Sequence, residues 1–248
     1  MEKKLIIDLL SDTHNQHNRF TCPGGDILLH SGDVSSRGTD MEILNFINWF
    51  EQQKYEFKIF IPGNHDWSLE KNFAYWKDEC DKRRITLLND SGIIIKSMDD
   101  PNLNLRVWGS PVQPWFHSWA FNRHRTQKEA TFKHPWIKPH WDAIPEHTEI
   151  LLTHGPPMGI LDEVLHINGT SYDPPNNVGC EELLKRIKET QIKLHVFGHI
   201  HCGRGFLYHP EITYVNGSAL DEMYCSVSDK PMRITREIVQ DGSVVYIL

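Results

Sequence analysis

The sequence predicts a layered α/β sandwich. Short apolar runs rich in Ile, Leu and Val recur along the 248 residues, which is typical of buried strands. Apolar residues at helical spacing (i, i+3, i+4, i+7) lie between some of these runs. Strands and helices therefore alternate, and we expect parallel crossovers early in the chain and hairpins near its C-terminus.

The predicted strands are short apolar runs, several of which end in Gly, Asp or Asn. In chain order they span 5–10, 26–30, 57–61, 105–109, 149–154, 193–198, 213–217 and 243–248. Two helices are predicted from apolar stripes. The first stripe comprises Ile43, Phe46, Ile47 and Phe50, after Thr39 or Asp40 as the N-cap. The second comprises Cys180, Leu183, Leu184 and Ile187. Residues 111–147 and 166–178 are irregular, and loops of this length are functional or mobile.

Composition limits the function classes. The chain is 39% hydrophobic and has no apolar run long enough to cross a membrane, so we expect no membrane association. A net charge of −7 disfavours binding to extended nucleic acid, although it leaves room for a small phosphorylated substrate. Five cysteines without a C-x-x-C motif, and an N-terminus without signal-peptide features, predict a cytoplasmic location. With no internal repeat or linker, residues 1–248 are expected to form one domain.

Polar side chains follow five of the predicted strands. They are Asp12 and His14, Asp33, Asn64, His154, and His199 with His201. Any one of them has a structural explanation, such as a helix cap or a turn. Five such endings at the same relative place instead indicate one shared site, because ligands in α/β sheets bind beyond the carboxyl ends of the strands.

The donor types indicate a pair of metal ions. Imidazole nitrogen with carboxylate and amide oxygen suits Mn, Fe, Zn, Co or Ni. Two cations about 3.5–4 Å apart need an anionic bridge, and the short carboxylate of Asp33 is central in the series. His199 and His201 are two residues apart, so one strand end can serve both ions. The remaining donors divide into two groups, Asp12, His14 and His201 on one side and Asn64, His154 and His199 on the other.

The ordered motifs D-x-H, G-D, G-N-H-D, H and G-H-x-H between residues 12 and 201 closely resemble the calcineurin-like metallophosphoesterase superfamily. The segments GSPVQPWFHSWAFNR and THGPPMGILD are similar to small metallophosphoesterase-domain proteins related to class III cyclic-nucleotide phosphodiesterases. The resemblance implies a four-layer α/β/β/α sandwich of two mixed sheets flanked by helices. It also implies two divalent metals, manganese being favoured, and in-line attack on phosphorus by a metal-bound hydroxide. Some relatives of that group lack the first histidine of the last motif, whereas His199 is present here.

The resemblance assigns catalysis to His65, as the group that protonates or stabilises the leaving oxygen. Protein Ser/Thr phosphatases carry a second Asp in the G-D motif that orients this histidine. Ser36 stands in that place here, which argues against a protein phosphatase and leaves the orientation of His65 open. Arg37 keeps the position of a phosphate-contacting arginine, although a solvated or structural arginine is an equal alternative.

Residues 111–147 contain aromatic side chains that either stack on a nucleobase or, as we favour, pack the loop onto the domain. They are Trp115, Phe116, Trp119, Phe121, Trp136 and Trp141. Asn122 and Arg123 are candidate substrate contacts. We therefore expect a hydrolase acting on a small phosphodiester or phosphomonoester, with cyclic and linear nucleotides among the candidates. The alternatives are a metal-dependent nuclease and a non-catalytic metal-binding scaffold. The sequence leaves the oligomeric state open.

Overall fold

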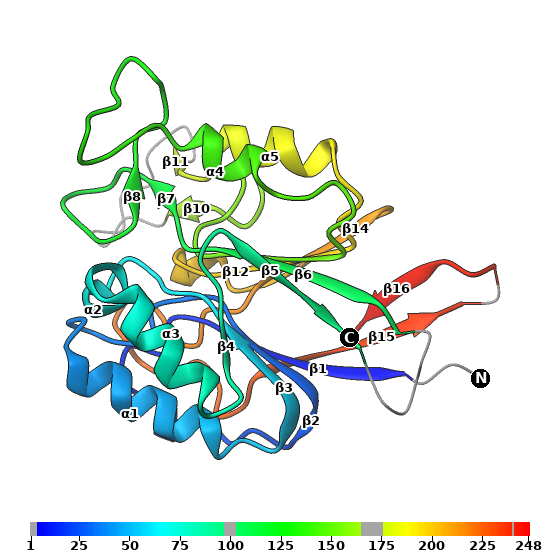
Figure 1. Ribbon diagram of the computed structural model, residues 1–248. Coiled ribbons are helices and arrows are strands. Elements are labelled where there is room, and N and C mark those ends of the chain that lie inside the picture. The colour runs from blue at the N-terminus through cyan, green and yellow to red at the C-terminus, as the bar shows by residue number, and fades with distance from the viewer. Residues whose placement is uncertain (1–3, 97–102, 165–175, 240) are drawn as a thin grey trace.

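The computed structural model describes residues 4–96, 103–164, 176–239 and 241–248. Within these residues two six-stranded sheets pack face to face, and helices cover both outer faces (Figure 1). The predicted four-layer sandwich of two mixed sheets is confirmed. None of the helices in these ranges is long and apolar enough to span a membrane.

The first sheet has the strand order β16-β15-β1-β2-β3-β4. Its strands are β1 (Leu5–Leu10), β2 (Gly25–His30), β3 (Tyr55–Phe60), β4 (Thr86–Leu87), β15 (Met232–Ile238) and β16 (Val244–Ile247). Strands β1 to β4 are parallel, and β15 pairs antiparallel with both β1 and β16. The early crossovers and the late hairpin agree with the predicted connectivity.

The second sheet has the order β13-β14-β12-β9-β6-β5. Its strands are β5 (Ser91–Ile95), β6 (Leu105–Ser110), β9 (Ile150–Thr153), β12 (Leu194–Phe197), β13 (Gly205–His209) and β14 (Ile212–Asn216). The four inner strands are parallel, and both edge strands are antiparallel to their neighbours. Two short ribbons pair β7 (Gln113–Pro114) with β8 (Asn122–Arg123) and β10 (Glu163–Val164) with β11 (Asn176–Asn177).

The helices form the outer layers. On the first sheet lie α1 (Asp40–Glu51), α2 (Trp67–Lys71) and α3 (Phe73–Asp81), and on the second lie α4 (Lys138–Asp142) and α5 (Glu181–Lys188). Two single turns, η1 (His17–Arg19) and η2 (His201–Gly203), complete the described elements. Thr39 is the N-cap of α1, and its capping box with Glu42 decides between the two predicted caps.

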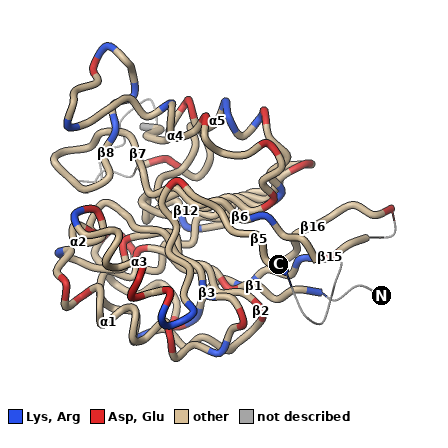
Figure 2. The backbone as a smooth tube through the Cα atoms, in the orientation of Figure 1, with Lys and Arg blue, Asp and Glu red and all other residues tan. Residues whose placement is uncertain are grey.

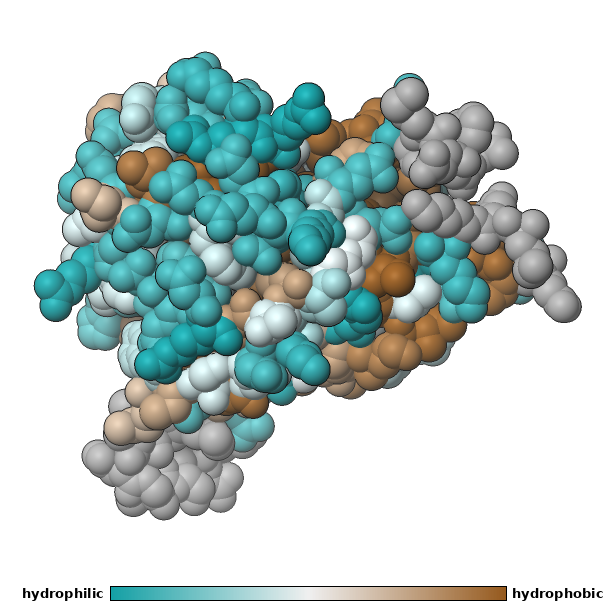
Figure 3. Space-filling model, turned by 90° about the horizontal axis from the view of Figure 1, so that it is seen from below, coloured by the Kyte–Doolittle hydropathy of each residue, from teal (hydrophilic) through white to brown (hydrophobic). Residues whose placement is uncertain are grey.

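The core lies between the two sheets. Residues of alternate strand positions, such as Ile7 and Ile27 on the first sheet and Leu152 and Val196 on the second, are fully buried there. Separate apolar clusters join each helical layer to its sheet. Seen from below, most of the outer surface is hydrophilic, and hydrophobic side chains gather at one end (Figure 3). Both sheets are therefore buried on two faces, which fits their nearly continuous apolar runs.

Sequence reasoning missed several elements. It did not identify α2 and α3, nor the strands β4, β5, β13 and β15. Strand β13, mostly exposed at a sheet edge, has only the short apolar run 206–208 and not the longer Ile-, Leu- and Val-rich run on which the other predictions depended. Cys180 is the N-cap of α5 and not part of its first turn, but it is buried, as expected for a packing residue. Of the irregular segment 166–178, residues 166–175 lie outside the described part of the chain.

Candidate metal centre

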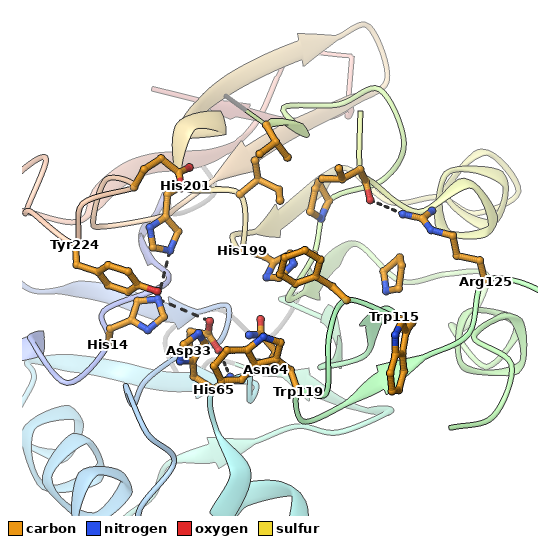
Figure 4. A pocket seen from close by; sticks show the side chains of 18 residues that line it. His14, Asp33, Asn64, His65, Trp115, Trp119, Arg125, His199, His201 and Tyr224 are labelled. Carbon is orange, nitrogen blue, oxygen red and sulfur yellow. Dashed lines mark hydrogen bonds and ion pairs between the residues drawn. The ribbon is translucent and has the colours of Figure 1, made fainter. Parts of the chain in front are cut away.

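The predicted metal ligands meet at one edge of the sandwich. They lie in the loops that follow β1, β2, β3, β9 and β12, where these parallel strands end. Figure 4 shows side chains from both sheets pointing into one pocket at this edge. The structure therefore brings together all seven: Asp12, His14, Asp33, Asn64, His154, His199 and His201.

The donor atoms form three groups, of which one, His14 with Asp33 and His65, connects the two that contain the predicted ligands. One group contains Asp12, His14 and His201, and another contains Asp33, His154 and His199, with the ligating atoms of each group within 4.8 Å of one another. Asp33 Oδ2 lies 3.7 Å from His14 Nε2 and 3.4 Å from His154 Nε2. One carboxylate thus faces an imidazole of each group, which is the position that a bridging ligand requires.

Within the first group, the Nε2 atoms of His14 and His201 are 3.3 Å apart, and His201 Nε2 lies 3.6 Å from Asp12 Oδ1. Within the second, His154 Nε2 lies 2.8 Å from Asn64 Oδ1. Nitrogen and oxygen donor atoms from distant parts of the chain therefore converge at short distances. Such a donor set fits two borderline-hard divalent cations.

Backbone carbonyls orient two of these rings. His154 Nδ1 donates to the carbonyl of Ser31 at 3.0 Å, and His201 Nδ1 donates to that of Asp221 at 2.9 Å. Each bond fixes the tautomer and leaves Nε2 as the coordinating atom, as in metal-bound histidines generally.

The ligands are held in strained backbone. Asp12, His14, Asp33 and His199 have φ between 40° and 68°, a left-handed region that costs non-glycine residues about 1–3 kcal/mol. Such strain persists where the surrounding fold imposes it, and it concentrates at functional sites. The chain also approaches the ligands closely: a Cβ at Gly198 would lie 2.0 Å from Asp12 Oδ2, so only glycine fits there.

The buried carboxylates and imidazoles of the site shift one another's pKa values. Burial alone would raise the pKa of the Asp33 carboxyl, but the neighbouring His154 imidazole holds it well below its usual range. Burial alone would lower the pKa of His154, and the charge of Asp33 instead raises it to about 9. His14 and His199 are dominated by burial, which lowers their pKa values to about 4 and about 3. The buried Asp33 carboxylate and the His154 imidazole thus stabilise each other's charged form.

The His65 ring is oriented without a carboxylate, although the His65 backbone N–H donates to Asp33 Oδ1 at 2.8 Å. Its Nδ1 donates to the backbone carbonyl of Ser36 at 2.7 Å, so residue 36 orients the ring through its main chain. The His65 ring stacks on Trp119, with centroids 4.3 Å apart, and meets His14 edge-on at 4.7 Å. Three contacts therefore fix the imidazole, and the orientation that the sequence left open is provided by a neutral acceptor.

Asp66 joins the two loops beside His65. Its carboxylate accepts hydrogen bonds from the backbone N–H groups of Gly63, Val34 and Ser35 and from the Ser35 hydroxyl. Burial and then the nearby charge of Asp33 raise the pKa of Asp66 to about 6. Asp66 acts on the loops and has no bond to the His65 ring among the described contacts.

A pocket of about 440 Å³ opens over the metal ligands. One wall carries aromatic side chains from the irregular segment, namely Trp115, Phe116 and Trp119. The other aromatics of that segment, Phe121, Trp136 and Trp141, pack in the core clusters. The predicted packing role is therefore confirmed for these three residues, and contact of Trp115, Phe116 and Trp119 with a nucleobase stays a prediction.

The three predicted substrate contacts have other surroundings. Arg37 is exposed and its backbone N–H donates to Glu42, while Asn122 is buried and its amide donates to the Phe116 and His117 carbonyls. Arg123 donates to His140 and to the Asn122 carbonyl. None of the three is among the described residues that line the pocket. Their contact with a substrate stays a prediction.

Sequence reasoning missed Tyr224, which lines the pocket opposite Trp119. It lies in a turn after β14, and no motif marks it. In the sequence, Tyr224 is an aromatic residue in a polar, turn-rich stretch just beyond a strand end. This pattern is too common to identify one residue.

Comparison with known proteins gives a consistent result. The family model of the calcineurin-like phosphoesterases matches residues 5–203. Metallophosphoesterase domain-containing protein 1 of Homo sapiens is 34% identical over 238 residues, which cover 90% of this chain and 67% of the human protein. A UPF0046 protein of Caenorhabditis elegans is 28% identical over 226 residues, covering 86% and 69%.

Solved structures show the same fold at low sequence identity. The crystal structure of TT1561 of Thermus thermophilus superposes with a TM-score of 0.53 at 14% identity, covering 87% of this chain and 90% of that one. Phosphopantetheinyl hydrolase from Mycobacterium tuberculosis gives a TM-score of 0.50 at 14% identity, with coverages of 86% and 88%. At this identity the likeness supports the architecture alone.

Proposed function

The chain belongs to the calcineurin-like phosphoesterase family, and from this premise we propose that it is a dinuclear-metal-dependent hydrolase of a small phosphodiester or phosphomonoester. The observation that carries the proposal is the place of Asp33, whose Oδ2 faces His14 in one ligand group and His154 in the other. We further propose a cytoplasmic enzyme of one domain that uses manganese, with Fe, Zn, Co or Ni as alternatives. Cys22, Cys80, Cys180 and Cys225 are free thiols.

Asp12, His14, Asp33 and His201 would hold the first ion, and Asp33, Asn64, His154 and His199 the second. Divalent cations at such a site supply hydroxide at neutral pH and offset negative charge on the phosphoryl oxygens. The strained, hydrogen-bonded loops keep the donor atoms converged before any ligand arrives, which reduces the reorganisation needed for binding.

His65 is the proposed general acid. Its Nδ1 keeps a proton for the Ser36 carbonyl, so Nε2 is the atom left to give a proton to the leaving oxygen. Stacking on Trp119 limits rotation of the ring and keeps Nε2 aimed along one direction. A positioned acid of this kind contributes about 10²–10⁴-fold to the rate.

The charge of the pocket favours a small substrate over extended nucleic acid. Among the described lining residues the one Arg or Lys is Arg125, and its guanidinium donates to the Val178 and Gly179 carbonyls and to Glu181. Figure 2 shows Lys and Arg interspersed with Asp and Glu along the helices, without a basic stripe leading to the site. A nuclease would need such a stripe.

The test is a substrate panel with manganese-reconstituted protein, comparing cyclic nucleotides, linear dinucleotides, oligonucleotides and phosphomonoesters. We expect turnover of at least one small ester, abolished by a chelator and restored by manganese. Preference for oligonucleotides would support the nuclease instead. Absence of turnover on every substrate, with two ions bound per chain, would support the non-catalytic scaffold.

A further inference from the structure

The phenol of Tyr224 is a polar group in the pocket to which the mechanism above gives no role. Its ring meets two ligands of the first group edge-on, His14 with centroids 4.9 Å apart and His201 at 5.5 Å. Figure 4 shows Tyr224 on the His201 side of the site, across from Trp119 and His65. The phenol thus lies beside the first ion's proposed donors, and His65 contacts the same His14 ring.

The backbone of Tyr224 is held in a costly conformation. Its φ is 58°, in the left-handed region. The Tyr224 N–H donates to the Asp221 carbonyl at 2.9 Å, and its own carbonyl accepts from Gln16 Nε2 at 3.2 Å. Asp221 Oδ1 accepts the N–H groups of Met223 and Cys225, which closes the turn. The turn is therefore fixed from both sides, and it imposes the position of the ring.

The same turn orients a metal ligand. The Asp221 carbonyl that accepts from Tyr224 also accepts from His201 Nδ1 at 2.9 Å. The next side chain, Glu222, accepts the Cys202 N–H at 3.0 Å. Tyr224 and His201 consequently share one rigid support, so the phenol keeps a constant place relative to the ion that His201 would bind.

The phenol oxygen is unused by the protein. The structure gives it no hydrogen bond to any described residue, and the side chain is 47% exposed toward the pocket. Phosphoryl oxygens require donors, yet the guanidinium of Arg125 is already engaged by two carbonyls and Glu181. A phenol is a donor that can be aimed at such an oxygen.

We propose that Tyr224 is a further catalytic residue, whose O–H donates a hydrogen bond to a phosphoryl oxygen of the ester bound at the ligand groups. The inference rests on the proposed function and names one more group that touches the substrate. As hydroxide forms its bond to phosphorus and the ester P–O bond breaks, the leaving oxygen takes its proton from His65. Tyr224 keeps its proton throughout and stabilises the charge that grows on the phosphoryl oxygens.

The test replaces Tyr224 by phenylalanine, which keeps the ring contacts and removes only the hydroxyl. Tyr208→Phe, at an exposed position on β13, is the matched control. On manganese-loaded protein we expect Tyr224→Phe to lower kcat for bis-p-nitrophenyl phosphate about a hundredfold. We also expect it to weaken binding of inorganic phosphate by calorimetry about tenfold, with two ions still bound per chain. The control should match the wild type throughout.

The other outcomes overturn the proposed role of Tyr224 or leave phosphate binding as its test. Wild-type kcat and phosphate affinity in Tyr224→Phe would overturn the proposal while leaving the proposed function intact. Loss of metal from the variant would also overturn it, because Tyr224 would then act by supporting His201. If the wild type hydrolyses no ester, the proposed function fails. The phosphate affinities then decide alone: weaker binding in the variant supports the hydrogen bond, and equal binding refutes it.

Discussion

The two sheets contribute different chemistry to the site. Loops after the first sheet's strands provide every carboxylate and amide donor, namely Asp12, Asp33 and Asn64. Loops after the second sheet's strands provide imidazoles alone, from His154, His199 and His201. Neither sheet therefore carries a complete ligand set, and the site forms only where the two sheets dock.

Hydrogen bonds across this junction lie at the ligands themselves. The His199 N–H donates to both oxygens of Asp12, and the His154 ring donates to Ser31 beyond β2. Away from this edge the sheets meet mainly through an apolar core, and the polar contacts of Arg236 and Tyr246 with Glu149, before β9 begins, touch none of the proposed ligands. Hydrogen bonds therefore position the proposed ligands, and apolar burial between the sheets contributes most of what holds them together. The predictions below test that division.

The largest effect is expected from removing the shared carboxylate. Asp33→Ala leaves each imidazole group without its common anion, so we expect loss of both ions and a fall in turnover of at least about a hundredfold. Metal content by elemental analysis and hydrolysis of bis-p-nitrophenyl phosphate measure the two effects. Asp78→Asn, in an exposed ion pair on α3, is the control. Two ions retained per chain would reject the bridge.

His65→Ala should separate catalysis from metal binding. The residue comes from the first sheet but is not among the proposed ligands, so we expect two bound ions and at least about tenfold slower hydrolysis of the same diester. An exposed histidine of the irregular segment, His117→Ala, serves as the comparison. A rate equal to that of the wild type would remove His65 from the mechanism.

Gly198→Ala should weaken the contact between the β12 loop and the first sheet. The added methyl would lie 2.0 Å from Asp12 Oδ2 and Ser11 Oγ, forcing the β12 loop away from the first sheet. We expect a loss of about 1–3 kcal/mol in the free energy of unfolding, measured with urea, and weaker manganese affinity. At Gly217, on the next strand's end, a methyl meets its nearest atom at 3.4 Å. Gly217→Ala should be tolerated, and equal losses in both variants would contradict the close-contact argument.

The last effect is on acid stability alone and concerns a buried histidine outside the site. Neither ring nitrogen of His17 has a partner among the described residues, and burial lowers its pKa to about 4. The unfolded chain, with a pKa of about 6.5, binds more protons between these values, so stability falls as the pH drops through that window. The contribution is up to about 3 kcal/mol.

His17→Phe should therefore make chelator-treated protein less sensitive to acid, as shown by urea unfolding at pH 7.5 and pH 4.5. The proposed metal-binding residues take up protons equally in both proteins. The difference in acid sensitivity between the two proteins therefore comes from His17. His117→Phe should leave the acid sensitivity unchanged. If His17→Phe lost as much free energy of unfolding between pH 7.5 and pH 4.5 as the wild type, burial of His17 would not be a source of the acid sensitivity.

Sequence reasoning selected side chains that the structure brings together, because each follows a short apolar run, a local signal that needs no knowledge of the fold. The sandwich followed from the alternation of strands and helices. The edge strands β5 and β13 were missed because their apolar runs are only three residues long, 93–95 and 206–208. The support of His65 by the Ser36 carbonyl and the place of Tyr224 were also inaccessible, because both depend on loop geometry that side-chain identity does not encode.

The bond from His65 to Ser36 has a consequence for variation. Since the acceptor is a main-chain atom, every amino acid at position 36 carries it. A chain that relies on a carboxylate loses the orientation of its histidine with one codon change, whereas here the acceptor for His65 remains with any side chain at position 36. The Ser36 hydroxyl has a separate contact, a hydrogen bond to the His14 carbonyl at 2.7 Å. The orientation of the His65 ring therefore depends on the path of the backbone at residue 36, which many residues of the loop determine together.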